Sequence, residues 1–156
     1  MVYQKKLFNR LKLKTWISGQ PIQIDYTNEF NSEIISLVQA FKKDGHPVIL
    51  ATASPLFSAE RVLAQCPVTF QELITSSNSN NIKGIKKLYE IQRSLEHYDS
   101  INFIYIGDAF ADLKIMKIAT ESYFVGRGII FLIGHYIFRI SGFKKVKLQM
   151  RPKEEK

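Results

Sequence analysis

Two carboxylates, Asp108 and Asp112, follow the apolar run 103–106 at a spacing that suits metal chemistry. The run has the composition of a buried strand of a parallel sheet, and Gly107 after it allows a sharp turn. Asp108 would then stand at the carboxyl end of the strand, where open α/β sheets place their ligands, with Asp112 one turn into the next helix. Two hard oxygen donors facing one point suit Mg²⁺. The alternative is that Asp108 caps the helix and Asp112 is a solvated surface acid.

Hydroxyl and ammonium groups stand at two further points where predicted elements meet. Thr52 and Ser54 follow the apolar run 48–51, and Lys83 begins a predicted helix. Taken singly, the hydroxyls could cap a helix and the lysine could be a solvated surface residue. Together with the carboxylates they predict a phosphate site, in which the hydroxyls donate hydrogen bonds and Lys83 offsets the charge of a phosphoryl group as it is transferred. Mg²⁺ would neutralise and orient the substrate, a phosphorylated small molecule.

Apolar runs and helical stripes alternate along the chain and would position these groups. Short apolar runs predict strands, and stripes at i, i+3 and i+4 predict helices. Asn28 is expected to cap the first of these helices, which ends at Gly45 after two lysines. The expected strands are 22–24, 48–51, a short strand within 68–75, 103–106 and 122–125, and the expected helices are 30–41, 55–65, 83–95 and 111–119. This alternation predicts an α/β fold with a doubly wound parallel sheet.

Basic residues are concentrated at the two ends of the chain, which has 156 residues and a net charge of +8. We therefore divide it into a basic N-terminal segment 1–20, an α/β core 21–138 and a basic C-terminal tail 139–156. Residues 4–16 also have the pattern of a short amphipathic helix, expected to dock on the core, with a membrane surface as the alternative. Basic ends can contact an anionic membrane surface or nucleic acid, of which nucleic acid is not favoured.

Cysteine content and hydropathy favour a cytoplasmic protein. The single cysteine, Cys66, excludes an internal disulfide and fits a reducing compartment. The longest apolar stretch, 129–140, contains Gly134, His135 and Arg139, and it is too short and too interrupted to span a bilayer. We therefore expect a cytoplasmic chain, with peripheral membrane contact through its basic ends as the alternative.

Three segments of the chain resemble motifs of the haloacid dehalogenase superfamily of phosphohydrolases. The segments similar to its second, third and fourth motifs are Val48–Ser54, Asn81–Gly84 and Ile106–Asp112. By this resemblance Thr52 takes the phosphate-binding position and Lys83 that of the phosphate-side lysine. Asp108 takes the metal position, with Asp112 supporting it. The resemblance therefore implies catalytic roles for Thr52 and Lys83 and a Mg²⁺ site at the two aspartates.

The resemblance extends from Tyr26 to Val125. Within the superfamily it is greatest for the domain fused ahead of membrane prenyltransferases of the polyprenyl-transfer type. It implies a Rossmann-like core in three layers, built around a parallel sheet, and phosphatase-type hydrolysis assisted by Mg²⁺.

The first motif of that family, Asp-x-Asp, does not occur in this sequence. In the family its first aspartate is the nucleophile that forms a phosphoaspartate, and its second is the general acid/base. Asp25 is the nearest candidate nucleophile, with Thr27 where the second acid should stand. Its distance from Thr52 nevertheless suits the segment that leads into the following helix. No other nucleophile is identified, so we expect phosphatase activity to be absent or severely impaired.

The strand that carries the first motif is central in the family's sheet, and here the basic segment 1–20 occupies its place. We expect an N-terminally truncated domain, such as a shortened or split gene would produce. Its exposed strand edges would then be covered by Ile22–Ile24, by a partner or by self-association. The alternative function is a non-enzymatic binding module whose basic ends contact an anionic membrane surface or another protein.

Overall fold

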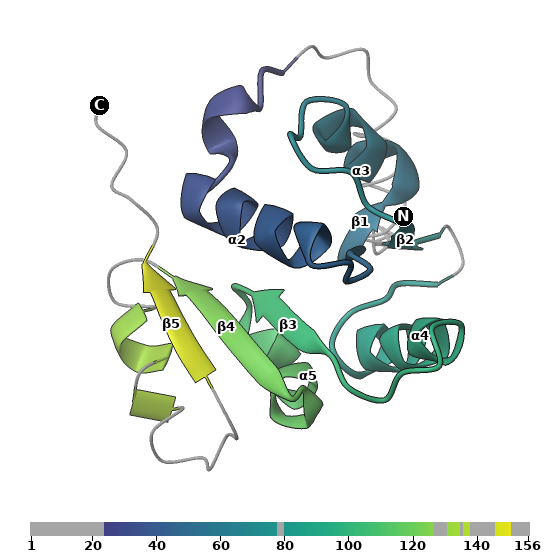
Figure 1. Cartoon of the computed structure of the whole chain (residues 1–156), viewed down its shortest axis with the longest axis vertical. Coiled ribbons are helices and arrows are strands. Elements are labelled where there is room, and N and C mark those ends of the chain that lie inside the picture. Colours follow the sequence, from purple (N-terminus) through teal and green to yellow (C-terminus); the bar gives the residue numbers. More distant parts are fainter. Residues whose placement is uncertain (1–23, 78–79, 127–130, 135, 138–145, 151–156) are drawn as a thin grey trace, which may run out of the picture. The chain divides into compact units, whose positions relative to one another are not determined.

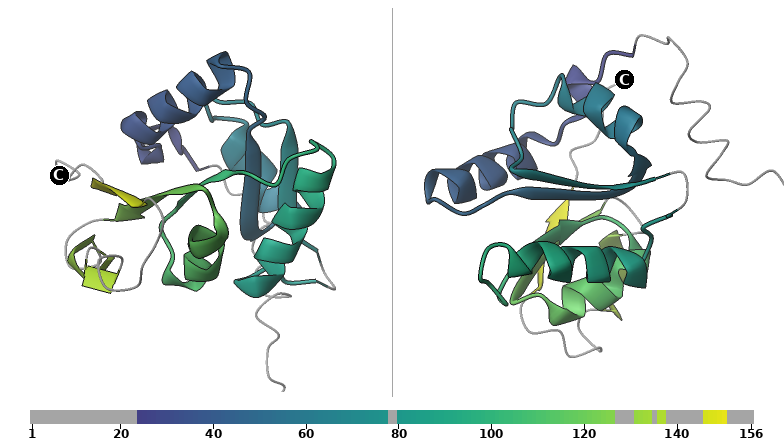
Figure 2. Two further views of the ribbon diagram at one scale, coloured as in Figure 1. Left: turned by 60° about the horizontal axis from the view of Figure 1, so that its bottom comes forward. Right: turned by 90° about the vertical axis from the view of Figure 1, so that its right-hand side faces the viewer.

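A computed structural model of the chain describes residues 24–77, 80–126, 131–134, 136–137 and 146–150. The chain divides into two compact units, Met1–Ile82 and Lys83–Lys156, and each is described by itself (Figure 1, Figure 2). Both units combine helices with parallel strands, which confirms the predicted mixed α/β class. The predicted helix 4–16, the basic segment 1–20 and most of the tail 139–156 lie outside the described residues.

The first unit is a strand–helix–strand arrangement preceded by a helix. It contains η1 (Thr27–Glu29), α2 (Ser32–Lys43), β1 (Ile49–Pro55), α3 (Leu56–Leu63) and β2 (Glu72–Ser76). The two strands pair in parallel, and α3 connects them. Because parallel neighbours run in the same direction, α3 must return from the carboxyl end of β1 to the amino end of β2.

Strand β1 is longer than the sequence predicts. Its register with β2 is irregular between Ala51 and Pro55, where Pro55 aligns with Ser76. The prediction that Thr52–Ser54 ends the strand was therefore wrong. The hydroxyl of Ser76 donates to the carbonyl of Ala53 at 3.0 Å, which holds this part of β1 against β2 where the backbone register is broken.

The first long helix begins later than predicted. Its cap is Asn31, whose side-chain oxygen accepts hydrogen bonds from the backbone N–H groups of Glu33 (3.0 Å) and Ile34 (3.2 Å). Asn28 lies inside η1, so its prediction as the cap was wrong. The predicted end is confirmed, with Gly45 following in the left-handed region at φ +83°. Ile24 is described without regular structure, and the other residues of the predicted strand 22–24 lie outside the described ranges.

The second unit is built on a three-stranded parallel sheet in the order β3-β4-β5. It contains α4 (Ile85–Glu96), β3 (Ile104–Gly107), η2 (Phe110–Asp112), α5 (Leu113–Ile118), β4 (Glu121–Gly126) and β5 (Val146–Met150). The middle strand β4 lies at the centre of the core, and Phe124 on it is fully buried. Helices α4 and α5 lie side by side (Figure 2). The predicted helix 111–119 is divided, because Asp112 ends a 3-10 turn before α5 begins.

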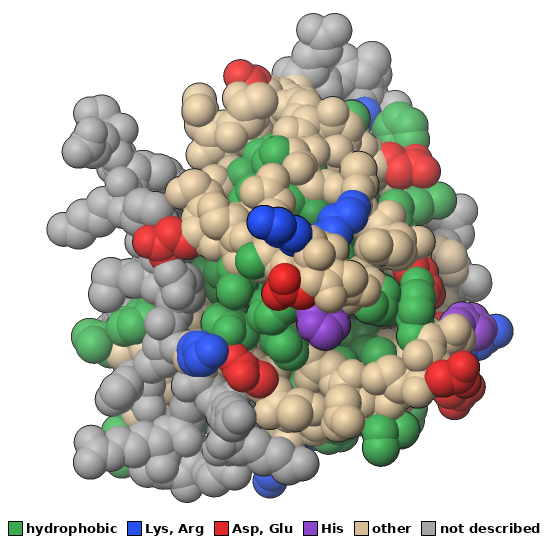
Figure 3. Space-filling view, viewed as in Figure 1, with side chains coloured by type: hydrophobic (Ala, Val, Ile, Leu, Met, Phe, Trp, Pro, Cys, Tyr) green, Lys and Arg blue, Asp and Glu red, His purple; other side chains and the backbone are tan. Residues whose placement is uncertain are grey.

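The surface mixes charges of both signs. On the face drawn in Figure 3, acidic and basic side chains are interspersed with apolar ones. None of the described helices has the length and apolar content needed to cross a bilayer.

Candidate functional site

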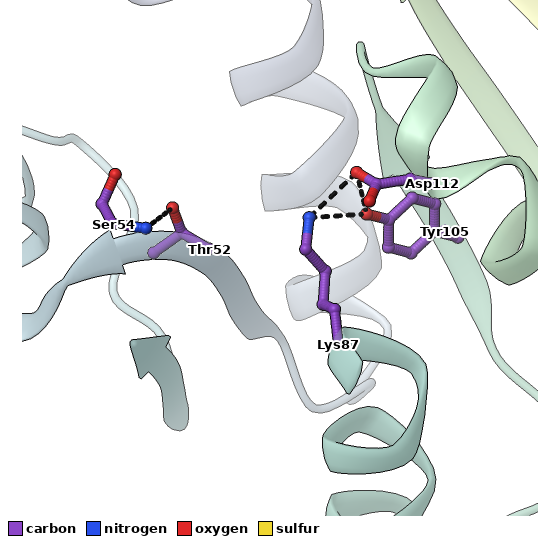
Figure 4. Close-up of polar contacts among 5 residues, drawn as sticks. All are labelled: Thr52, Ser54, Lys87, Tyr105 and Asp112. Atoms are coloured by element: carbon purple, nitrogen blue, oxygen red, sulfur yellow. Dashed lines mark hydrogen bonds and ion pairs between the residues drawn. The ribbon is translucent and has the colours of Figure 1, made fainter. Parts of the chain in front are cut away.

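A buried cluster of three polar side chains lies in the second unit (Figure 4). The Lys87 ammonium donates to Asp112 Oδ2 at 2.9 Å and forms an ion pair with it. The Tyr105 hydroxyl donates to the same oxygen at 2.8 Å and lies 3.4 Å from the Lys87 Nζ. All three residues are buried, at 8% exposure for Lys87 and Tyr105 and 4% for Asp112. We call these residues the lysine–tyrosine–aspartate cluster.

Each member of the cluster comes from a different element. Lys87 lies on the buried face of α4 with Leu88, Ile91 and Ser94, so its stem packs with apolar neighbours while its charged end meets Asp112. Tyr105 lies on β3. Asp112 occupies the N-cap position of α5 but makes no side-chain capping bond there, so its carboxylate turns to the lysine and the tyrosine instead.

One glycine leaves room for the cluster, and a second glycine precedes α4. A Cβ atom on Gly107 would lie 2.7 Å from the ring atom Cε1 of Tyr105 and 3.2 Å from Cε of Met116, so a side chain there would displace the tyrosine. Gly107 is therefore required for space, whereas the sequence suggested a turn. Gly84, ahead of α4, has φ +60°, and its Cβ position lies 3.6 Å from the carbonyl of Ala111. The start of α4 thus approaches the residue next to Asp112.

The electrostatics of the cluster favour a protonated tyrosine. Burial raises the pKa of the Tyr105 phenol well above its usual range, and the charge of Asp112, the hydrogen bond to it and the charge of Asp108 raise this pKa further. Lys87 and Asp112 neutralise each other as an ion pair, and the charge of Asp108 also acts on the tyrosine.

Asp108 and Lys83 are both exposed, and each lies close in the sequence to a member of the lysine–tyrosine–aspartate cluster. Asp108 follows β3, and its charge acts on Tyr105. Ala109, one residue later, occupies the N-cap position of η2. Asp112 is buried, so the alternative of a solvated surface acid is wrong. Lys83 directly precedes Gly84, the N-cap residue of α4.

The described residues fit a metal shared with a bound phosphate better than a metal held by protein alone. Among the residues that the structure describes, no group of three or more His, Cys, Asp or Glu side chains could hold a metal ion. Asp112 is buried and its Oδ2 accepts two hydrogen bonds, and Asp108 is an exposed carboxylate directly after β3. Mg²⁺ is often bound by one or two carboxylates together with substrate phosphate oxygens. Asp108 fits that role, and the metal role of Asp112 stays a prediction.

In the first unit the predicted hydroxyl groups lie within β1 and are half-buried. The Thr52 hydroxyl oxygen accepts a hydrogen bond from the backbone N–H of Ser54 at 3.2 Å (Figure 4). This bond uses the hydroxyl as an acceptor, and a hydroxyl also carries one donor. Thr52 can therefore still donate to a ligand.

Buried Ser76 joins the predicted second motif to the predicted third. Its hydroxyl donates to the carbonyl of Ala53, between the two predicted phosphate-binding residues, and accepts from the backbone N–H of Ile82 at 3.1 Å. Because Lys83 follows Ile82 in the chain, the third motif begins beside the carboxyl end of β1. The sequence analysis did not identify Ser76, since nothing in the polar run 76–81 distinguishes it from its neighbours.

Asp25 lies in surroundings that do not suit a nucleophile. Its carboxylate accepts hydrogen bonds from the hydroxyl (2.6 Å) and the backbone N–H (2.9 Å) of Thr27, and these bonds lower the pKa of Asp25. Gln65, just beyond α3, accepts from Tyr26 N at 2.7 Å and donates to the carbonyl of Ile24 at 2.9 Å. Asp25 is thus held near the end of α3, which is the amino end of the strands. Thr52 is the fourth of the seven residues of β1.

The structure connects the three predicted motifs in pairs. Within the first unit, Ser76 links the second motif to the start of the third. Within the second unit, the Lys87–Asp112 ion pair links the helix after the third motif to the fourth. Convergence of Thr52, Lys83 and Asp108 on one point stays a prediction. The sequence analysis also missed Lys87 and Tyr105; the helical spacing of Lys87 to Ile91 and Ser94 is the signal that could have indicated a buried lysine.

Comparison with known proteins does not assign the chain to a family. No protein-family model matches it, and no solved structure matches it significantly. The chain is similar to a curated protein of Sinorhizobium fredii, described as the uncharacterized protein y4nM, with 29% identity over 102 residues. This match covers 65% of the chain but spans only 19% of that relative. The resemblance to the haloacid dehalogenase superfamily therefore stays a prediction.

Proposed function

We propose that the chain is a haloacid-dehalogenase-like domain that binds a phosphorylated small molecule together with Mg²⁺ and hydrolyses it very slowly or not at all. The proposal includes the Rossmann-like three-layer core of that superfamily. The observation that carries it is the lysine–tyrosine–aspartate cluster, because it joins the helix after the third motif to the fourth motif. Desolvation of a buried ion pair opposes folding, so its presence between two segments predicted to share a phosphate site supports a role beyond stability.

Each polar residue has a role in this proposal. Thr52 and Ser54 donate hydrogen bonds to phosphoryl oxygens at the carboxyl end of β1. Lys87 is the fixed cation, held by Asp112 and Tyr105, and exposed Lys83 is a second cation at the start of α4. Asp108 is the carboxylate that would hold Mg²⁺, which when bound neutralises the phosphate and orients it.

The pairing of Lys87 supports dependence on Mg²⁺. Lys87 is neutralised by Asp112, and the charge of Asp108 acts on Tyr105 in the same region. A Mg²⁺ ion held by Asp108 would supply positive charge to the phosphate that the paired lysine does not. Phosphate and Mg²⁺ are therefore expected to bind together.

Loss of catalysis follows from the sequence. No Asp-x-Asp occurs in the chain, and Asp25 makes local hydrogen bonds near the amino end of the strands. Without a carboxylate nucleophile the covalent route through a phosphoaspartate is not open. Binding by the other residues does not require that nucleophile.

The test is calorimetric titration of the full chain with inorganic phosphate, with and without Mg²⁺, beside an assay of aryl phosphate turnover. We expect phosphate binding in the presence of Mg²⁺ only, and no turnover. Thr52→Val should weaken binding about tenfold or more, since a hydrogen bond to a charged group is lost. Thr75→Val, a matched change of a half-buried threonine on β2, should not weaken it. Absence of phosphate binding, or rapid turnover abolished by Asp25→Asn, would refute the proposal.

A binding module without catalysis is the second candidate function. It is favoured by the absence of Asp-x-Asp and by exposed apolar side chains at Leu132 and Tyr136, each 67% exposed, which are followed in sequence by the basic tail 139–156. Sedimentation with phosphatidylserine vesicles at low and high salt tests contact with an anionic membrane. Binding that weakens with salt favours this candidate, and no binding at either salt concentration counts against it.

A further inference from the structure

Helix α2 is amphipathic, yet none of its residues is buried. The apolar side chains that recur at helical spacing along one side of it are each half-buried, and we call them the α2 stripe: Ile34, Leu37, Val38 and Phe41. The Lys42 ammonium donates to the carbonyl of Thr69 at 2.9 Å, which connects a polar side of the helix to the loop before β2. The α2 stripe itself is incompletely covered.

Strand β1 of the same unit is incompletely covered as well. Of its seven described residues, six are half-buried and Pro55 is buried. An apolar strand of a parallel sheet is normally covered by helices on both faces. Among the described elements, α3 packs against β1 and β2, whereas α2 contacts these strands less extensively. The first unit therefore has apolar surface on which a further element can pack.

The segment 4–16, which lies outside the described residues, has the composition to cover this surface. Its pattern predicts an amphipathic helix with Leu7, Phe8 and Leu11 on one side. A helix over 4–16 would be about 20 Å long, which matches the length of about 18 Å expected for α2. The chain between them, 17–31, spans about 50 Å when extended, so it allows the segment to reach either end of α2.

The charges of the two segments are opposite. Residues 1–14 carry five Lys or Arg and no acidic residue. Residues 24–41, which include the α2 stripe, carry no Lys or Arg and three acids: Asp25, Glu29 and Glu33. Glu33 directly precedes the first residue of the stripe. Opposite charges along two surfaces favour their association and disfavour other pairings.

We propose that segment 4–16 forms a helix that packs on the α2 stripe and completes the core of the first unit. Leu7, Phe8 and Leu11 contact the stripe, and the basic side chains beside them lie near the acids of residues 24–41. The short connection between the two segments gives them a high effective concentration, which favours this occupant over a separate protein or a second copy of the chain.

The test is amide hydrogen exchange of the full chain at low concentration, measured for 4–16, α2 and α4. Exchange in 4–16 is expected to be about tenfold or more slower than in an unfolded chain. Leu11→Asp should abolish this protection and speed exchange in α2, because it places a charge in the apolar contact, and it should leave α4 unchanged. Asn9→Asp creates the same side chain on the opposite side of the predicted helix and should change neither.

The reciprocal change is made on α2. Leu37→Asp should speed exchange in 4–16, whereas Ser36→Asp, at an exposed position of the same helix, should not. Loss of protection in β1 and β2 would show that Leu37→Asp unfolds the first unit. In that case Leu11→Asp decides the test, because it alters none of the described residues.

Three results would overturn the proposal. The first is exchange in 4–16 at the rate of an unfolded chain, or protection that arises only when phosphatidylserine vesicles are added, which would assign the segment to a membrane surface. The second is protection that grows with protein concentration, which would identify a second copy as the occupant. The third is faster exchange in the second unit, and not in α2, in Leu11→Asp. The inference does not depend on phosphate binding, so either proposal can fail alone.

Discussion

The polar side chains of the two units differ in their charge, their burial and their bonding partners. In the first unit, Thr52 and Ser54 are neutral and half-buried, and the Thr52 hydroxyl accepts a hydrogen bond from the backbone N–H of Ser54. In the second unit, Lys87 and Asp112 are charged, buried and bonded to each other. A neutral hydroxyl can keep its capacity to bind a ligand at little cost, whereas a buried charge needs a permanent partner. In the proposed function the first unit offers hydrogen bonds to a phosphate, and the second holds a fixed ion pair on which its own stability is expected to depend.

The largest effect is expected when the ion pair is broken. Asp112→Ala should lower the free energy of unfolding by about 3–5 kcal/mol, because it leaves the buried Lys87 ammonium without its partner. The double variant Lys87→Met/Asp112→Leu should recover most of that loss, because it removes both charges and keeps apolar volume. Urea unfolding followed by circular dichroism measures both. Equal losses in the single and double variants would show that the ion pair is not what holds this region.

Removal of the Tyr105 hydroxyl should have the next largest effect on the free energy of unfolding. Tyr105→Phe removes its hydrogen bond to the Asp112 carboxylate and should lower the free energy of unfolding by about 1.5–3 kcal/mol. Burial and the nearby carboxylates raise the pKa of Tyr105, so the folded protein holds this proton more tightly than the unfolded chain, where tyrosine ionises near pH 10.0.

This pKa difference also predicts a pH dependence. The stability that the protonated Tyr105 contributes to the folded state is complete below about pH 10. It is lost as the pH rises above this value towards the pKa of Tyr105 in the folded protein. Tyrosinate absorbance should show one tyrosine that resists ionisation until unfolding, and the Tyr105→Phe variant should lack it. Ionisation of every tyrosine near pH 10 in the folded protein would contradict the buried geometry.

The effect of Gly107→Ala on the free energy of unfolding should be smaller but still measurable. The added methyl group would lie 2.7 Å from the Tyr105 ring and should cost about 1–3 kcal/mol through overpacking. In a Tyr105→Leu background the same change should cost less, because the obstructing ring is absent. Equal costs in both backgrounds, measured by urea unfolding, would exclude this clash as the cause.

The smallest effect is expected in the first unit, where it sharpens the contrast with the second. Asn31→Ala should lower the free energy of unfolding by about 1 kcal/mol through loss of the helix cap, and Asn28→Ala should change it little. Hydrogen exchange should show that the loss is confined to α2 and leaves α4 unchanged. The opposite ranking of the two asparagines would support the position predicted from sequence.

Local patterns predicted most elements of the fold because strands and helices here follow apolar periodicity. The run 103–106 was expected and β3 is observed one residue later, whereas the cap moved from Asn28 to Asn31 because a 3-10 turn precedes the helix. The site was harder to predict. Burial of Lys87 depends on Asp112, far away in the chain, and no local pattern reports such a pairing.

Phosphate binding by the variant that lacks the ion pair tests the central claim most directly. Lys87→Met/Asp112→Leu should remain folded, so calorimetric titration with phosphate and Mg²⁺ can test the binding role of the ion pair separately from its effect on folding. The account predicts that the unchanged chain binds phosphate with Mg²⁺, that the double variant does not, and that Lys83→Met weakens binding by a smaller factor. Phosphate binding by the folded double variant as tight as that of the unchanged chain would contradict it.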